Sequence, residues 1–152
     1  MAEEKIKPPW WLKPMNKVFM AVLKLGVPIG GDNGPVVLTV TGRSTGKPRP
    51  VPVTPMTVDG ARYVVGGFPG ADWVRNARAN PEATYTQNRR SRPVRLVEMS
   101  VEQARPLLRQ FPTLVPTGVS FIRNAGLVTE GSPDEFEALA GRCAVFRIDP
   151  AG

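Results

Sequence analysis

The densest group of polar residues lies in the nine residues from Thr41 to Arg49, between two stretches that favour β-strands. The group contains two glycines, two further hydroxyls and three cations: Gly42, Gly46, Ser44, Thr45, Arg43, Lys47 and Arg49. Glycines let backbone N–H groups approach an oxyanion, hydroxyls can donate to it, and cations neutralise its charge. This turn therefore predicts a phosphate site, and the alternative is a solvated hairpin loop. It is not a P-loop, because the Lys-Ser/Thr pair and the following helix are missing.

A second glycine-rich stretch, Gly66-Gly67-Phe68-Pro69-Gly70-Ala71, runs into residues 72–79, which favour a helix. The N-terminus of a helix offers free N–H groups and the positive end of the helix dipole to an anion. Trp73, just inside that helix, could line a planar ring. In the alternative interpretation Asp72 caps the helix and Trp73 is buried in the core.

Four arginines, Arg89, Arg90, Arg92 and Arg95, form the strongest cationic cluster. Arg92 and Arg95 should lie on opposite faces of a strand, because side chains alternate along it. No aromatic residues interleave with these cations, and neither a helix-turn-helix nor a zinc finger is visible. We expect a solvated charge run rather than a specific nucleic-acid site.

The residue types that are missing exclude several kinds of chemistry. The chain has 152 residues, a net charge of +7, no His and one Cys. Without His there is no Ser-His-Asp or Cys-His nucleophile and no imidazole base, and one Cys builds no metal cage. Cys143 cannot form an internal disulfide, so it is expected to be a small core residue in a reducing cytoplasm.

The positive charge is concentrated in residues 1–98, which hold 15 Lys and Arg against 7 Asp and Glu. Such asymmetry predicts an anionic partner, which could be nucleic acid, an acidic membrane surface or a phosphorylated ligand. No secretory signal is recognised, and the apolar stretch Val18–Leu23 is far shorter than the roughly 20 residues that span a bilayer.

The first predicted element is a helix over Pro14–Leu25, with an apolar stripe and Gly26 after its end. Lysines lie off the stripe, and Trp10 and Trp11 precede it. The helix could pack on its own domain, or rest on an anionic membrane through its apolar face.

The remaining pattern predicts a mainly β fold with helices. We expect about six antiparallel strands, over 36–41, 49–58, 62–65, 82–87, 92–99 and 142–148, with helices over 72–79, 100–110 and 132–141. Prolines in the second strand predict an edge or bulged position. A single domain over 1–152 follows, with a helical segment over 1–30 and a small β-barrel over 36–152.

Two motifs in this order resemble the deazaflavin-dependent nitroreductase family of the flavin/deazaflavin oxidoreductases. They are residues 40–49 (VTGRSTGKPR) and 72–81 (DWVRNARANP), with Asp59-Gly60 and residues 62–65 between them. The resemblance covers residues 36–99, and the ending at 143–148 also fits. It implies an FMN-binding split-barrel-like fold, a split β-barrel.

The resemblance also implies binding of coenzyme F420, an 8-hydroxy-5-deazaflavin with a phosphate and an anionic glutamate tail; FMN is the alternative. By position, the phosphate and tail fall on Arg43, Ser44, Thr45, Lys47 and Arg49. The ring falls near the backbone of Val51, Pro52 and Val53, and the loop Gly66, Gly67, Phe68, Pro69, Gly70 and Ala71 would border it with Trp73 and Asn76. Many members have Lys or Arg in place of Ser44, a difference that would weaken tail binding unless Arg43 or Lys47 compensates.

The implied activity is hydride transfer from reduced F420 to a quinone, an activated alkene or a nitro compound. Nitro-reducing members carry tyrosines where this chain reads 111–116 without any Tyr, which implies an apolar substrate pocket. Phe111, Leu114 and Phe121 would line that pocket or belong to the core. No catalytic residue is identified. Two alternative functions remain: an FMN-binding or non-catalytic cofactor-carrying protein, and a lipid-binding protein on the membrane surface. The reductase itself is expected in the cytoplasm, free or in peripheral contact with the inner face of the membrane.

Overall fold

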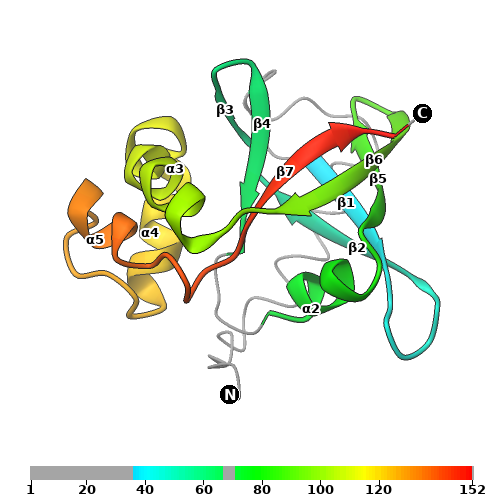
Figure 1. Cartoon of the computed structure of the whole chain (residues 1–152), viewed down its shortest axis with the longest axis horizontal. Helices are drawn as coiled ribbons and strands as arrows, with labels where there is room; N and C mark the ends of the chain where they lie inside the picture. The colour runs from blue at the N-terminus through cyan, green and yellow to red at the C-terminus, as the bar shows by residue number, and fades with distance from the viewer. Residues whose placement is uncertain (1–35, 67–70, 152) are drawn as a thin grey trace.

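A computed structural model of the chain describes residues 36–66 and 71–151 (Figure 1). The helix expected over 14–25 lies outside the described residues. The strands are β1 Val36–Thr41, β2 Pro48–Val53, β3 Met56–Val58, β4 Ala61–Val65, β5 Glu82–Gln87, β6 Arg90–Glu98 and β7 Val145–Pro150. The helices are α2 Asp72–Ala79, α3 Val101–Leu114, α4 Pro116–Asn124 and α5 Pro133–Glu137.

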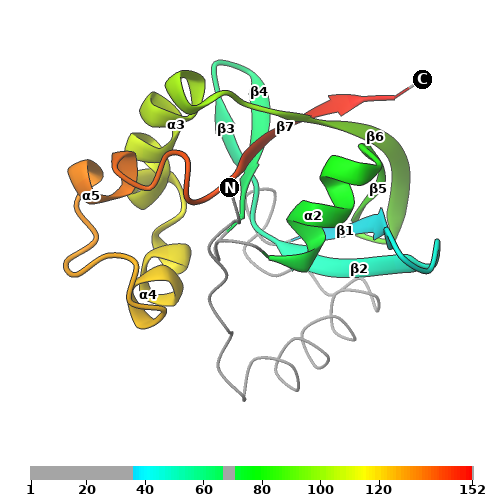
Figure 2. The same ribbon diagram turned by 60° about the horizontal axis from the view of Figure 1, so that its bottom comes forward.

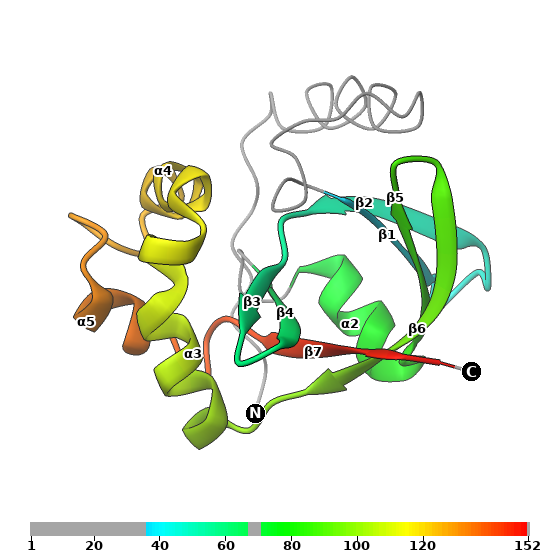
Figure 3. The same cartoon turned by 90° about the horizontal axis from the view of Figure 1, so that it is seen from above.

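The strands form one antiparallel sheet in the order β2-β1-β5-β6-β7-β4-β3. β2 and β3 lie at opposite edges of this order, yet only Thr54 and Pro55 join them. Three Cα–Cα steps reach at most about 11 Å. The sheet must therefore curl until its edges approach each other, as Figure 3 shows. This curled sheet confirms the expected mainly β split barrel.

Side-chain alternation fills the inside of the curl with one apolar cluster. β1 contributes Val36, Leu38 and Val40, and every other strand except β3 adds at least one buried residue. Helix α2 closes one end, because Val74 and Ala77 pack into the same cluster (Figures 2 and 3). The barrel therefore has an end covered by α2 and an opposite end where β5 and β6 turn.

Helices α3, α4 and α5 form a second layer outside the barrel, against β3, β4 and β7 (Figure 1). Phe111 stacks on Phe136 with ring centroids 5.1 Å apart. A Cβ at Gly118 would lie 2.6 Å from the Phe111 ring, so only glycine lets α4 approach α3 this closely. Phe111 is thus a core residue, Leu114 is 41% exposed, and Cys143 is buried in the same layer, as predicted for that cysteine.

Two of the predicted strands differ from the structure. The strand expected over 49–58 is two strands, because the chain must cross between the sheet edges at Thr54-Pro55. The last strand begins at Val145 rather than Arg142, since a turn at Gly141 with φ of 93° ties the N–H of Cys143 to the Leu139 carbonyl. The sheet consequently has seven strands, one more than the six ranges predicted.

The cap of α2 also differs from the prediction. Ala71 is its N-cap residue, with no side-chain cap, and Asp72 begins the helix. The extended backbone of Ala71 places its carbonyl to accept from the N–H groups of Val74 and Arg75. Asp72 still stabilises α2, because its carboxylate lies in the first turn and faces the positive end of the helix dipole.

The helical region after β6 is longer than predicted. The Ser100–Gln103 capping box is confirmed, but α3 continues past Gln110 to Leu114 despite Pro112. The segment from 111 to 131, which none of the predicted strands or helices covers, contains α4, which begins with Pro116 at its first position. Proline there and the apolar spacing of Val119 and Ile122 were the signals available in the sequence.

A loop before α5 is fixed by one carboxylate. Glu135 accepts hydrogen bonds from the N–H groups of Thr129, Glu130, Gly131 and Ser132 and from the Thr129 hydroxyl, at 2.6 to 3.3 Å. These hydrogen bonds lower the pKa of Glu135 to about 2, and the two from Thr129 contribute most.

We expect Glu135→Gln to destabilise the fold at neutral pH and to matter less in acid. The folded pKa lies below the unfolded value of about 4.3, so the ionised carboxylate stabilises the fold above that value. This contribution is lost as the pH falls toward 2. Denaturant unfolding of both proteins from pH 7 to pH 2 measures the difference, and Glu130→Gln in the same loop is the control. A difference that stays constant over this range would contradict the prediction.

Within the described part of the chain, no helix is both long and apolar enough to cross a membrane. The proposed membrane contact of the N-terminal helix and the division at residues 1–30 remain predictions.

Candidate functional site

The turn between β1 and β2 is held by its own backbone and needs glycine. The N–H of Gly42 donates to the Lys47 carbonyl and the N–H of Gly46 to the Gly42 carbonyl, both at 2.8 Å. A Cβ at Gly42 would lie 2.9 Å from the Thr45 hydroxyl oxygen and 3.4 Å from Nε of Arg49. Gly46 has φ of 71°, which glycine adopts without strain. The glycines therefore let Arg49 and Thr45 lie close over the turn.

Helix α2 fixes this turn through one buried amide. Asn76 is 6% exposed, and its Oδ1 accepts from the backbone N–H of Arg43 at 3.1 Å and from the Arg43 guanidinium at 2.7 Å. The same guanidinium lies 3.6 Å from the Asp72 carboxylate, an exposed and therefore weak pair. Asn76 and Arg43 are 33 residues apart in the sequence, so the fold alone brings the two motifs together.

The remaining cations of the turn are open to a ligand. Lys47 and Arg49 are exposed, and their charged groups have no hydrogen-bond or ion-pair partner within residues 36–66 and 71–151. The Ser44 hydroxyl is exposed and also lacks a partner there. Thr45 is partly engaged, because its Oγ1 accepts from the Lys47 N–H at 3.2 Å. Two cations and a hydroxyl on a rigid turn suit an oxyanion.

Strand β2 is an edge strand, because within residues 36–66 and 71–151 no strand pairs with its outer side, and this confirms the expected edge position. Pro48, Pro50 and Pro52 alternate along it and have no N–H, so Arg49, Val51 and Val53 are the residues able to donate to β1. Backbone groups alternate between the two sides of a strand. The open edge therefore carries proline carbonyls and no N–H, and it can accept from the N–H groups of a ring.

The residues beyond β4 are shaped by the close passage of α2. A Cβ at Gly66 would lie 2.7 Å from the Val74 side chain, and the Gly66 N–H donates to the Ala144 carbonyl at 2.8 Å. Ala71 and Trp73 are half-buried, and the Trp73 ring packs 5.6 Å from that of Phe146. Gly67, Phe68, Pro69 and Gly70 lie outside the described residues.

Most of the predicted site residues separate into four groups. Ser44, Lys47 and Arg49 are exposed for a ligand, and Val51 and Pro52 are half-buried at the open edge. Arg43 and Asn76 are hydrogen-bonded to each other, so this pair joins the β1–β2 turn to α2. Val53 and Gly66 are buried and pack within the barrel. The pairing of Arg43 with Asn76 was not predicted, since nothing in the local sequence pattern relates two residues so far apart.

The donor set fits a coenzyme that carries a phosphate and an anionic tail. Phosphate oxygens need several charge-assisted donors, and the turn provides an exposed guanidinium, an exposed ammonium and an exposed hydroxyl. The N-terminus of α2 lies beside this turn, as its bonds to Arg43 show, and adds the positive end of its dipole.

Solved structures share this fold. A structure described as an F420-H2 dependent reductase (FDR-A) is 21% identical, with 76% of this chain and 93% of that chain covered and a TM-score of 0.52. A FAD-binding protein from Mesorhizobium loti is 17% identical, with 100% and 95% covered and a TM-score of 0.52. The haem storage protein HutZ from Vibrio cholerae is 11% identical, with 80% and 84% covered and a TM-score of 0.52. At these identities the likeness concerns the fold alone.

A comparison with curated proteins finds no match. Residues 17–120, more than half of the chain, match the family model described as F420H(2)-dependent quinone reductase. This range includes the β1–β2 turn, the open edge of β2 and the whole of α2. The chain therefore belongs to the F420H(2)-dependent quinone reductase family, whose cofactor is coenzyme F420 and whose activity is F420-dependent reduction.

Proposed function

We propose that this protein reduces a quinone, with coenzyme F420 held by the β1–β2 turn and the open edge of β2. When bound in its reduced form, the coenzyme supplies a hydride. The observation that carries the placement is the group of Lys47, Arg49 and Ser44, whose polar groups have no partner among the described residues, on a turn that α2 holds in place.

Each part of the site has its own task in this proposal. Arg49 and Lys47 neutralise the phosphate and the tail, and Ser44 donates to one of their oxygens. The carbonyl groups of Pro50 and Pro52 accept from N–H groups of the ring. The half-buried indole of Trp73 covers the deazaflavin ring on the side of α2 and excludes water from that side of the ring.

The protonation that accompanies reduction favours a quinone over an activated alkene. Hydride addition to a quinone leaves a phenolate, which takes its proton from water, since phenols have pKa values of about 10. Addition to an activated alkene leaves a carbanion that benefits from a positioned acid. The chain has no His, and neither of its tyrosines belongs to the turn or to α2: the Tyr85 hydroxyl accepts from Arg62, and Tyr63 packs on the layer of α3 to α5.

The test is a titration followed by a screen of acceptors. Purified protein is titrated with oxidised F420 and, separately, with FMN, and Trp fluorescence is recorded because Trp73 lies beside the proposed ring position. We expect binding of F420 at micromolar concentration or below, and much weaker binding of FMN. With reduced F420, a benzoquinone should be reduced faster than cyclohexenone or a nitroimidazole. Failure to bind F420 would contradict the site, and a preference for either of the other acceptors would contradict the quinone.

A further inference from the structure

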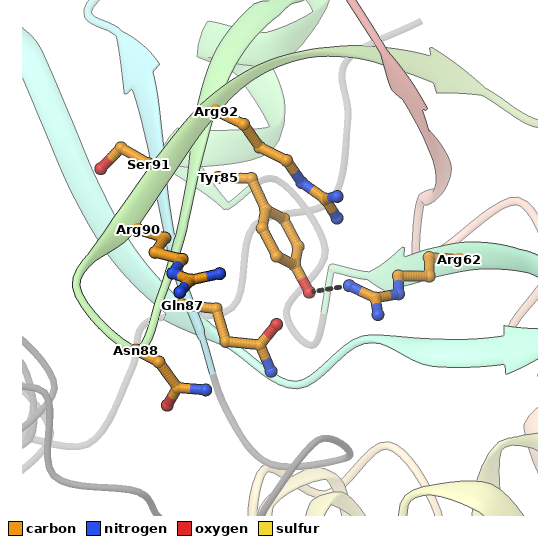
Figure 4. Close-up of a pocket in the computed structure, with 7 residues that line it drawn as sticks. All are labelled: Arg62, Tyr85, Gln87, Asn88, Arg90, Ser91 and Arg92. Atoms are coloured by element: carbon orange, nitrogen blue, oxygen red, sulfur yellow. Dashed lines mark hydrogen bonds between the residues drawn. The ribbon is translucent and has the colours of Figure 1, made fainter.

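A second cationic site lies at the end of the barrel opposite α2. It is a pocket of about 490 Å³ lined by residues of β4, β5, β6 and the β5–β6 turn: Arg62, Tyr85, Gln87, Asn88, Arg90, Ser91 and Arg92 (Figure 4). Three of these residues are arginines and none is acidic. The pocket includes two members of the arginine cluster for which the proposed function has no use.

Strand alternation divides that arginine cluster, as the sequence predicted. Arg95 points to the outer face and pairs with Glu82 at 2.7 Å. Arg90 and Arg92 share the parity of the buried Val94 and Leu96, so they belong to the inner face of the sheet and line the pocket. Arg62 on β4 shares the parity of the buried Val64, so it also belongs to the inner face and lines the pocket opposite the residues of β5 and β6.

One buried tyrosine organises these cations. Tyr85 is 2% exposed, and its hydroxyl accepts from the Arg62 guanidinium at 2.8 Å. The guanidinium carbons of Arg62 and Arg92 lie 5.6 and 4.7 Å from the centre of its ring. Figure 4 shows the three arginines arranged around this ring. The hydroxyl proton of Tyr85 has no acceptor among the described residues and remains available to a ligand.

The positive charge of the pocket is not balanced by the part of the chain that the structure describes. None of the three guanidiniums lies within 4.0 Å of a carboxylate there. Like charges gathered in a hollow repel each other and create a strong positive potential. An anion in the pocket would offset that repulsion and gain several charge-assisted hydrogen bonds.

The charge and the size of the pocket indicate the class of ligand. A single carboxylate carries one negative charge, whereas a phosphate carries up to two and offers three oxygens to planar guanidinium forks. The volume of about 490 Å³ is in the usual range for organic ligands, far above the need of a bare ion. We propose that the pocket binds a phosphate ester, with Arg62, Arg90, Arg92 and the Tyr85 hydroxyl around the phosphate.

The pocket lies away from the β1–β2 turn, where the phosphate and tail of the coenzyme are proposed to bind, whereas Pro52 at the edge of β2 is in register with Val37 and Thr86 and lies nearer the pocket end. Ala83 pairs with Val40 near the β1–β2 turn, whereas Gln87 pairs with Arg90 at the other end of β5. Four residues of strand correspond to about 13 Å. The apolar cluster that includes Val74 and Ala77 of α2 fills the barrel between the two ends.

Calorimetric titration of the full chain with inorganic phosphate and with glycerol 3-phosphate tests the proposal. We expect Arg92→Gln to weaken both interactions about tenfold or more, because a charge-assisted bond is lost. Arg105→Gln, which removes the same charge from the exposed face of α3, should change them less than twofold. Tyr85→Phe keeps the ring and its packing and should weaken them several-fold, so the test does not depend on the stability of one variant.

The same titration at saturating F420 separates the two sites. Phosphate should still bind, and it should also bind to Arg49→Glu. If saturating F420 abolishes phosphate binding to the wild-type protein altogether, or if Arg92→Gln and Arg105→Gln weaken it equally, or if neither probe binds, the proposal is overturned. The coenzyme site can fail its own test without affecting this one.

The phosphate could belong to a soluble ester or to a lipid headgroup, and flotation with phosphatidylglycerol vesicles distinguishes the two sources. Vesicle binding that is lost in Arg92→Gln and retained in Arg105→Gln would assign the phosphate to a lipid. Binding of glycerol 3-phosphate without vesicle binding would assign it to a soluble ester. Both results support the phosphate site.

Discussion

Replacing Arg49 with glutamate is expected to abolish binding of coenzyme F420, with an affinity at least a hundredfold below that of the wild-type protein. The Arg49 side chain lies over Gly42 and has no carboxylate partner in the described residues, so its charge is free for a ligand. Its reversal removes a charge-assisted hydrogen bond, of about 1.5 to 3 kcal/mol, and places a negative charge beside the phosphate. Fluorescence titration with oxidised F420 measures the change.

Arg105→Glu is the matched control, because it makes the same change of charge on the exposed face of α3, away from the turn. It should alter the affinity only slightly, through the long-range field. Thermal unfolding of both variants should resemble that of the wild-type protein, since neither arginine has a partner to lose within residues 36–66 and 71–151. Equal affinities of wild type and Arg49→Glu would remove the turn from the coenzyme site.

The sequence contained most of the information needed for the strands. β5 and most of β1 follow alternation between apolar and polar residues, and the Ser100 capping box marks the start of α3. The break at Thr54-Pro55 could not be derived from the local pattern, because β-like residues continue on both sides of it. It results from closure of the barrel, where the chain passes from one edge of the sheet to the other.

The site was predictable only in its parts. Residues 41–49 indicate a phosphate turn because glycines, hydroxyls and cations occur together in a local segment. That Asn76 supports this turn depends on a contact between residues far apart in the chain. In the same way, Arg62 joins Arg90 and Arg92 only because β4 and β6 both pair with β7. Neither contact has a signal in one sequence.

Asn76→Leu should weaken F420 binding about tenfold, although Asn76 is buried. Leucine has the same branching at Cγ, although it is larger, and it removes the Oδ1 that accepts twice from Arg43, so the turn loses its link to α2. We also expect the free energy of unfolding to fall by about 1 to 3 kcal/mol, because partly buried donors lose their acceptor. Asn76→Asp keeps the acceptor and pairs with Arg43, so it should retain stability and weaken coenzyme binding only through its charge.

A double-mutant cycle with Arg43→Ala distinguishes support of the turn from direct contact with the coenzyme, which the family resemblance implies for Asn76. If Asn76 acts through Arg43, then Asn76→Leu should have little further effect on F420 affinity once Arg43 is alanine, because the link is already broken. If the two substitutions weaken binding additively, Asn76 contacts the coenzyme independently. We expect the non-additive result, since the Oδ1 of Asn76 already accepts two hydrogen bonds from Arg43 and its side chain is buried beneath the turn.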